Sequence, residues 1–217
     1  MSKRIPVIER IMKANDRQAL ANRAVFDQHG VHAVNIMAAP GAGKTSLILS
    51  TVKSLGGRLR VGAIEGDLAS TVDTDKLLAA GIPAVQINTG GGCHLDANQV
   101  GGALDALPLD DLDLVFIENV GNLVCPVGFA LGEHTRVGIS GVPEGDDKPH
   151  KYPTISANVD ALVVNKIDLM PYLPFDMVEF KRLVSSLNPD IRFFPVSCVT
   201  GEGLEEWAVW LIEIASK

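Results

Sequence analysis

The sequence lacks a long apolar run and any apolar stretch at its N-terminus. Its longest uninterrupted apolar runs, such as residues 114–117 and 161–164, are far shorter than the roughly 20 residues that a membrane-spanning helix needs. Charged residues at positions 3, 4, 9, 10 and 13 interrupt the region where a signal peptide would have its apolar core. We therefore expect a cytoplasmic protein with no membrane partner.

Basic clusters and cysteines are also scarce. The chain has 19 Lys and Arg against 26 Asp and Glu, a net charge of −7, and it has no Lys/Arg block, which argues against a nucleic-acid partner. Its 3 cysteines cannot all pair within one chain, and in a reducing compartment thiols serve metal binding, catalysis or packing more often than disulfides. With 217 residues, of which 47% are hydrophobic and 21% charged, the chain is typical of one globular domain.

Short apolar segments alternate with longer helical patterns from residue 31 onward. The segments that are rich in Val, Ile or Leu and short enough for strands are residues 31–37, 58–64, 84–87, 113–117, 136–142, 161–164 and 192–196. Helical patterns fall at residues 44–55, 74–80, 95–107, 175–187 and 203–215. This alternation predicts an α/β fold, a doubly wound and mostly parallel sheet with helices on both faces.

Two segments stand apart from this alternation. Residues 5–28 carry Val7, Ile8, Ile11, Leu20, Ala24 and Val25 among charged residues, which predicts an amphipathic helix lying on the domain. We accordingly divide the chain into an N-terminal helical segment, residues 1–30, and a nucleotide-binding domain with the metal site, residues 31–217. The stretch 143–149 (PEGDDKP) is polar and aperiodic, and we expect it to be a mobile loop.

A phosphate-binding loop follows the first strand. Residues 38–45 read AAPGAGKT, which matches the P-loop pattern except that Ala38 replaces the first glycine. The two remaining glycines allow the backbone N–H groups to turn toward phosphate oxygens, and the next helix presents its positive end. Lys44 would neutralise the β- and γ-phosphates, and the Thr45 hydroxyl would bind Mg²⁺. The expected nucleotide and magnesium contacts here are Gly41, Ala42, Gly43, Lys44, Thr45 and Ser46. An ordinary glycine-rich turn is the alternative.

A second motif indicates that the base is guanine. Asn165-Lys166-Ile167-Asp168 follows the predicted strand 161–164. Asp168 can accept hydrogen bonds from N1–H and the 2-amino group of guanine, and adenine has neither donor, so it would leave the carboxylate unpaired. Asn165 can tie this loop to the phosphate loop, and the Lys166 stem can lie over the base. In the loop Ser197, Cys198, Val199 a backbone N–H, that of Cys198, would face guanine O6, with the Cys198 thiol itself only packed.

Two acidic residues at predicted strand ends could complete the magnesium site. Asp67 ends the second strand, and Glu118 ends the fourth, where GTPases usually have Asp-x-x-Gly. The longer Glu118 can still reach the metal directly or through water, and the N–H of Gly121 can sense the γ-phosphate. Asp67 could bind magnesium, orient water or cap a helix. The candidate catalytic residues are Lys44, Asp67 and Glu118. Without an evident water-positioning glutamine or a supplied arginine, GTP hydrolysis should be slow.

Cys93, His94 and Cys125 form a candidate site for a soft metal ion. Cys93-His94 follows the third strand and Cys125 follows the fourth, so both loops should emerge at the carboxyl edge of the sheet. Two thiolates and an imidazole suit Zn²⁺ or Ni²⁺. The spacing is not a standard zinc pattern, so a buried Cys125 beside an exposed Cys93-His94 loop is an equally open interpretation. Three ligands suggest a site that is labile, completed by water or shared between subunits.

Together these motifs resemble the SIMIBI branch of P-loop GTPases, and within it the HypB family of hydrogenase nickel-incorporation proteins. The matching segments are residues 40–45, 65–67, 92–97, 118–126, 144–149 and 165–168. Of these, residues 118–126 (ENVGNLVCP) are the most specific.

The resemblance implies a GTPase that binds GTP or GDP with Mg²⁺ and helps to deliver nickel to [NiFe] hydrogenase. It implies a nucleotide-dependent homodimer whose Cys93, His94 and Cys125 hold Ni²⁺ or Zn²⁺ at the subunit interface, with a HypA-type metallochaperone and the hydrogenase large subunit as partners. The cysteine-rich and histidine-rich nickel motifs of some members are missing, since the 5 histidines are scattered. Any nickel function must then rest on the domain site.

Other functions remain open from the sequence. A urease-type nickel GTPase would be expected to have Cys-Pro-His, whereas Val127 follows Pro126 here. An ATP-binding partitioning ATPase is disfavoured by the guanine motif. A non-catalytic module that holds GTP and a structural zinc ion would share every motif, and only a hydrolysis measurement separates it from an enzyme.

Overall fold

The computed structural model describes residues 7–216, with side chains from residue 12 onward. Within this described part, seven strands form one sheet: β1 (His32–Ala38), β2 (Val61–Asp67), β3 (Ala84–Asn88), β4 (Leu114–Glu118), β5 (Thr135–Gly141), β6 (Ala161–Asn165) and β7 (Arg192–Pro195). Their order is β3-β2-β4-β1-β5-β6-β7, and every neighbouring pair is parallel. The predicted parallel α/β sheet is therefore confirmed.

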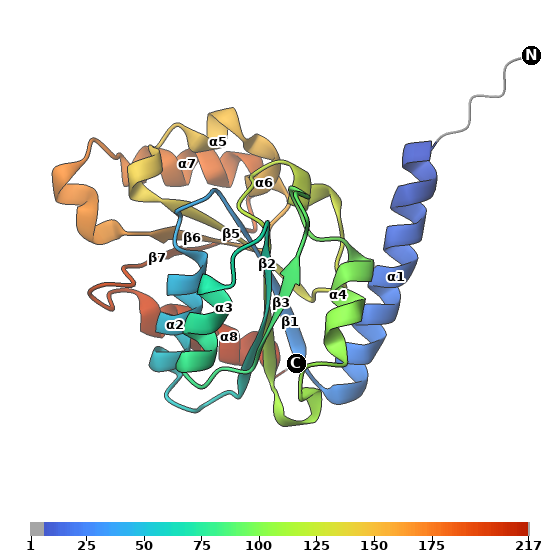
Figure 1. The fold of residues 1–217 in the computed structure, drawn as a ribbon. Coiled ribbons are helices and arrows are strands. Elements are labelled where there is room, and N and C mark those ends of the chain that lie inside the picture. Colours follow the sequence, from blue (N-terminus) through green and yellow to red (C-terminus); the bar gives the residue numbers. More distant parts are fainter. Residues whose placement is uncertain (1–6, 217) are drawn as a thin grey trace, which may run out of the picture.

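Helices cover both faces of this sheet (Figure 1). The main helices are α1 (Val7–His29), α2 (Lys44–Leu55), α3 (Val72–Ala79), α4 (Ala97–Leu104), α7 (Met177–Leu187) and α8 (Leu204–Ala215), with the short α5 (Lys148–Lys151) and α6 (Pro153–Ala157) between β5 and β6. One buried cluster joins the sheet to α2 and α8, and others join its opposite face to α4 and α7. Within residues 7–216, no helix is long and apolar enough to span a membrane.

Element ends differ from the prediction by only a few residues where a cap decides them. The helix predicted for residues 95–107 begins at Ala97 because Asp96 caps it and forms a capping box with Gln99. That cap leaves Cys93 and His94 in the preceding loop, where they are free of helical geometry.

Helix α1 forms as predicted, although residues 5 and 6 lie outside the described part and no side chain is described for Val7, Ile8 and Ile11. Its buried stripe is not the expected one. Leu20 is 72% exposed and Ala24 is exposed, whereas the helix buries Ala19, Phe26 and two asparagines, Asn15 and Asn22. Leu20 and Ala24 therefore face solvent, while Val25 packs against the core.

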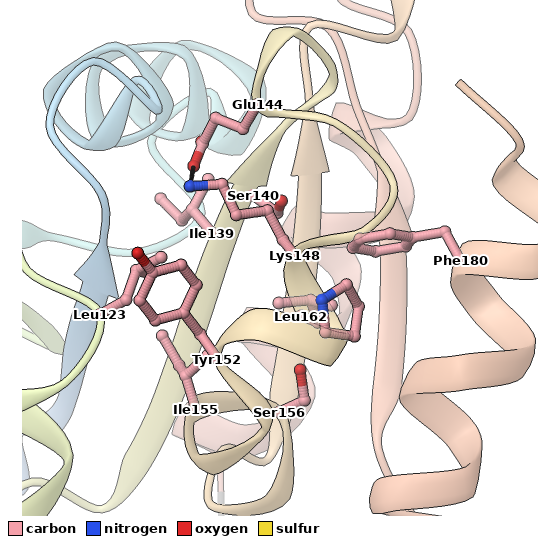
Figure 2. A pocket seen from close by; sticks show the side chains of 11 residues that line it. Leu123, Ile139, Ser140, Glu144, Lys148, Tyr152, Ile155, Ser156, Leu162 and Phe180 are labelled. Carbon is pink, nitrogen blue, oxygen red and sulfur yellow. Dashed lines mark ion pairs between the residues drawn. The ribbon is translucent and has the colours of Figure 1, made fainter. Parts of the chain in front are cut away.

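The segment 143–149 also differs from the expected irregular loop. It holds the 3₁₀ turn η3 (Val142–Glu144) and the start of α5, and Pro143 and Pro149 stand in the first turns, where a missing N–H costs no hydrogen bond. Glu144 accepts a hydrogen bond of 2.7 Å from the Gly141 N–H and lies 3.4 Å from the Lys148 ammonium. Figure 2 shows the ion pair between Glu144 and Lys148 at a small apolar cavity. These local contacts give the segment a defined conformation.

Candidate functional site

All the predicted site segments lie at one edge of the sheet. They follow β1, β2, β3, β4, β6 and β7, and because every strand is parallel, their carboxyl ends meet at that edge. Ligands of open α/β sheets bind at this edge. The structure therefore brings the phosphate, guanine and cysteine motifs to one rim.

The phosphate loop connects β1 directly to α2. Gly41 and Gly43 have φ angles of 77° and 98°, a region that favours glycine, and Gly43 stands at the N-cap of α2. A side chain on Gly43 would collide with the Asn165 amide. Ala38, the departure from the P-loop pattern, is the last residue of β1, fully buried and paired with Ile139. It has ordinary strand geometry, so no glycine is needed there.

Lys44 and Thr45 converge on Glu118. The Thr45 hydroxyl donates a hydrogen bond of 3.0 Å to Glu118 Oε1, and the Lys44 ammonium lies 3.7 Å from the same oxygen. Glu118 is 2% exposed at the end of β4. The predicted magnesium and phosphate residues thus already contact one another, while Ser46 lies exposed in the same turn of α2.

A further carboxyl group, which the sequence-based prediction did not assign, faces Glu118. Glu65 is 2% exposed and stands opposite Glu118 in the β2–β4 register. Burial, followed by the charge of Glu118, raises the pKa of Glu65 to about 10. Burial also raises the pKa of Glu118, opposed by the hydrogen bond from Glu65 and by Lys44. The raised pKa keeps Glu65 protonated at neutral pH beside Glu118.

Asp67 lies beside this pair in half-buried surroundings. Its Oδ1 accepts hydrogen bonds from the backbone N–H groups of Ala69 and Ser70, at 3.1 and 3.3 Å. It does not cap α3, whose N-cap is Thr71. Carboxylate oxygens of Glu65, Asp67 and Asp73 lie within 4.8 Å of one another.

These acidic groups suit a hard divalent cation. Within the described residues, one carboxyl oxygen each on Glu65 and Glu118 is buried without a hydrogen-bond partner. Mg²⁺ prefers oxygen ligands of this kind, in combination with phosphate oxygens. The donor set therefore fits the magnesium ion expected from the sequence.

We expect Glu65→Gln to stabilise the nucleotide-free protein increasingly as pH rises. The folded state raises the pKa of Glu65 above its usual 4.5, so the stability contributed by its protonated form is lost as pH climbs toward about 10. Glutamine mimics the protonated acid and has no such loss. Denaturant unfolding in EDTA should show the variant gaining on the wild type by up to about 1.4 kcal/mol per pH unit. A difference that stays constant between about pH 5 and pH 8 would contradict the assignment.

Gly121 lies directly against the phosphate loop. A Cβ atom at this position would lie 3.0 to 3.1 Å from atoms of Pro40, so only glycine allows this approach without a shift. Gly121 and Pro40 line a pocket together with Gly41, Lys44 and Glu118. The segment after β4 is therefore placed where a γ-phosphate would contact it.

The candidate guanine site lies beside the phosphate loop. Asn165, which ends β6 and is 1% exposed, donates a hydrogen bond of 3.0 Å to the Ala42 carbonyl. Lys166 adopts a left-handed conformation with φ 66°, and its ammonium donates to the Gly41 carbonyl at 2.7 Å. Asn165 thus ties the two loops together, as the sequence predicts.

Ser197 orients Asp168. The buried Ser197 hydroxyl accepts from the backbone N–H groups of Val199 and Thr200, which leaves its own proton for Asp168 Oδ1 at 2.5 Å. Val199 itself is 85% exposed. Cys198 is half-buried, and burial raises the pKa of its thiol. A neutral, packed thiol agrees with the structural interpretation of Cys198.

Cys93, His94 and Cys125 come together in space. Their ligand atoms lie within 4.8 Å of one another, and Cys93 Sγ lies 3.5 Å from His94 Nδ1. The His94 ring packs against Phe129 in a tilted arrangement, with ring centroids 4.0 Å apart, and burial lowers the pKa of His94, so the imidazole is neutral as a metal ligand must be. The hydrogen bond with Cys125 raises the pKa of Cys93. Two thiols and a neutral imidazole fit Ni²⁺ or Zn²⁺.

Asn122 connects the two loops of this cluster. Its Nδ2 donates a hydrogen bond of 3.3 Å to the Cys93 carbonyl, and its Oδ1 accepts from the N–H groups of Val124 and Cys125 at 2.8 and 3.4 Å. Asn122 directly follows Gly121, the residue against the phosphate loop. One short segment therefore contacts both candidate sites.

Comparison with known proteins identifies the family. Residues 32–195 match the family model described as the CobW/HypB/UreG nucleotide-binding domain. The chain is 47% identical to a hydrogenase maturation factor HypB of Azotobacter vinelandii, over 97% of this chain and 69% of the relative. The chain belongs to the HypB family. This confirms the resemblance inferred from the motifs.

Solved HypB structures agree with this assignment. HypB of Helicobacter pylori in complex with nickel superimposes with a TM-score of 0.90 at 34% identity, covering 94% of this chain and 95% of that one. HypB of Archaeoglobus fulgidus gives 0.87 at 40% identity, covering 94% and 99%. A LAO/AO transport system kinase and the signal recognition particle receptor FtsY share the fold at 15% and 16% identity, with TM-scores of 0.57 and 0.51. The SIMIBI architecture is thus confirmed.

Proposed function

We propose that this chain is a GTP-binding and GTP-hydrolysing nickel chaperone that acts in the maturation of [NiFe] hydrogenase. The observation that carries the proposal is the segment from Glu118 to Cys125. It begins at the Lys44 and Thr45 contacts of the phosphate loop and ends at a cysteine whose Sγ lies within 4.8 Å of Cys93 and His94 ligand atoms. Membership of the HypB family supports the same reading.

The nucleotide roles follow from the contacts. Asp168 would recognise guanine, with Ser197 orienting it, and the N–H groups of the phosphate loop would hold the phosphates. Lys44 would neutralise the β- and γ-phosphates. A bound magnesium ion would supply further charge neutralisation, held by Thr45, Glu118 and the acidic group at Asp67.

The hydrolytic step would be slow in the isolated chain. Asp67 is the candidate to orient the attacking water, and Glu118 to position magnesium and Thr45. The described residues place no arginine in the pocket lined by Lys44, Asp67 and Gly121, so charge developing on the γ-phosphate would rest on Lys44 and magnesium. A second subunit is one source of further groups.

The metal cargo would bind Cys93, His94 and Cys125. Nickel is the ion named with the Helicobacter pylori HypB structure, and the same donors suit zinc. Because the described residues offer three ligands here, the proposal includes a nucleotide-dependent homodimer that shares the site. It also includes a HypA-type metallochaperone as nickel donor and the hydrogenase large subunit as recipient.

We expect nickel affinity to differ at least about tenfold between the GDP state and a non-hydrolysable GTP analogue state, equivalent to about 1.4 kcal/mol. The reason is that a γ-phosphate would displace Gly121, and Asn122 passes that shift to Cys125 and Cys93. Competition with a chelator measures both affinities. Equal values would remove the coupling between the two sites.

Single-turnover hydrolysis with magnesium separates this proposal from its alternatives. A non-catalytic switch with structural zinc would bind GTP and release no phosphate above the uncatalysed rate. The urease-type alternative would activate urease instead of hydrogenase when the chain is supplied to extracts that lack their own nickel GTPase.

A further inference from the structure

Helix α1 buries two side-chain amides where apolar residues would be expected. Asn15 and Asn22 are 2% and 1% exposed, and they lie on the same stripe as Ala19 and Phe26. A buried amide destabilises a protein unless its donors and acceptor are paired. The hydrogen-bond partners of these two amides therefore identify the chain segments that α1 binds.

Both asparagines bind two chain segments at once. Asn15 accepts from the Ala97 N–H at 2.9 Å and donates to the Ala130 carbonyl at 2.8 Å. Asn22 donates to the carbonyls of Ala97 and Leu131 at 2.7 and 2.9 Å. Each amide thus links the start of α4 to residues 130–131, and both segments are held on the same face of α1.

These are the segments that carry the three candidate metal ligands. Ala97 opens α4 just after Cys93 and His94, and residues 130–131 follow the 3₁₀ turn η2 (Cys125–Gly128) that begins with Cys125. We propose that Asn15 and Asn22 are positioning residues that set the separation between the Cys93-His94 loop and Cys125. This inference rests on the proposed role of the cluster in metal binding.

A close approach at Gly132 strengthens the attachment of the second segment. A Cβ on Gly132 would lie 2.7 Å from Asn22 Cβ and 2.9 Å from the Ala19 carbonyl oxygen, and its φ is 104°. The Arg23 Nε also donates to the Gly132 carbonyl at 2.8 Å. The backbone after Cys125 is therefore pressed onto α1 and cannot drift from it without breaking these contacts.

The nucleotide side holds the same ligand loop at a second point, closer to His94. Asn119, next to Glu118, accepts a hydrogen bond of 3.0 Å from the Leu95 N–H, two residues before the attachment of Ala97 to α1. The Cys93-His94 loop is thus fixed at Leu95 by the nucleotide strand and at Ala97 by α1. Only the Ala97 attachment involves α1, so substitutions in α1 remove it and leave the bond between Leu95 and Asn119 in place.

The test uses Asn15→Ala, Asn22→Ala and the double variant in the full chain. Nickel affinity is measured by chelator competition, and GTP affinity alongside it. We expect the double variant to bind nickel about tenfold more weakly or worse, each single variant to fall between it and the wild type, and GTP affinity to change less than about twofold. Asn188→Ala is the matched control, because it also loses hydrogen bonds from one amide to two backbone carbonyls, Ser156 and Val159, away from the cluster.

A metal-free readout separates this inference from the proposed function. Oxidised glutathione converts the Cys93 and Cys125 thiols into one disulfide and is itself reduced to two thiols, so the equilibrium constant reports how closely the sulfurs meet. Peptide mapping identifies the pair. A change of at least about threefold in the disulfide equilibrium constant of the double variant, absent in Asn188→Ala, supports the positioning role of Asn15 and Asn22. If the wild type fails to bind nickel but this change appears, the proposed function fails and the positioning role stands.

The inference would be overturned if the double variant had the same nickel affinity and the same disulfide equilibrium constant as Asn188→Ala. If the double variant does not fold, Gln18→Ala replaces it, since Gln18 only donates to Asn22 Oδ1 at 2.9 Å and orients that amide. A smaller shift of the disulfide equilibrium in the same direction is then expected. No shift in Gln18→Ala and in Asn15→Ala would likewise reject the positioning role.

Discussion

Asp168→Asn is expected to lower GTP affinity at least about 100-fold and to admit xanthine nucleotides in place of guanine nucleotides. Ser197 donates to Asp168 Oδ1, and an asparagine oxygen would keep that bond, so its NH₂ group would face the base. There it meets the N1–H and 2-amino donors of guanine and accepts nothing from either. Losing charge-assisted hydrogen bonds costs about 1.5 to 3 kcal/mol each. Xanthine has a 2-oxo group that can accept from the new amide.

Competition binding with GTP, XTP and ATP measures this change. Asp176→Asn is the matched control: Asp176 caps α7 by accepting from the N–H groups of Val178 and Glu179, and asparagine caps helices equally well. The control should bind GTP like the wild type. An Asp168→Asn protein that still rejects XTP and keeps tight GTP binding would show that the base lies elsewhere.

The fold was predictable because its signals are local. Strands that are buried on both faces are nearly continuous runs of Val, Ile and Leu, and glycine-rich or polar turns separate them from helices. The burial of β1 and β4 along almost their whole length shows how complete that signal is. The phosphate and guanine loops were also predictable, since each is a short motif whose chemistry depends on neighbouring residues.

The features of the site that could not be predicted from the sequence depend on contacts between residues far apart in the chain. Glu65 is recognisable as a partner of Glu118 only once β2 and β4 are known to be neighbours in that register. A usable signal was present, since Glu65 directly follows the predicted strand 58–64 and Glu118 directly follows the predicted strand 113–117. Asn15 and Asn22 gave no signal, because an apolar pattern ignores amides and their partners lie 75 or more residues away along the chain.

Cys125→Ser and Cys93→Ser are each expected to weaken nickel binding by at least about 100-fold. A serine hydroxyl stays protonated at neutral pH and is a poor ligand for a soft metal ion, so each variant removes one of three donors. Cys125 is half-buried and Cys93 is exposed, and serine differs from cysteine by one atom, so folding should be preserved. Chelator competition gives the affinity, and the thiolate-to-nickel absorption band shows whether sulfur remains bound.

Cys198→Ser is the control for these variants. Cys198 lies in the loop beside Asp168, where its carbonyl accepts from the Ser50 hydroxyl at 3.3 Å, and it belongs to none of the described groups of clustered metal donors. Its substitution should leave nickel affinity unchanged. The stoichiometry of the wild type then tests whether two subunits share the site, since a shared site gives one ion per two chains and an unshared site gives one ion per chain. If Cys125→Ser kept full nickel affinity, Cys125 would not be a nickel ligand, and the segment from Glu118 to Cys125 would not connect the metal to the phosphate loop.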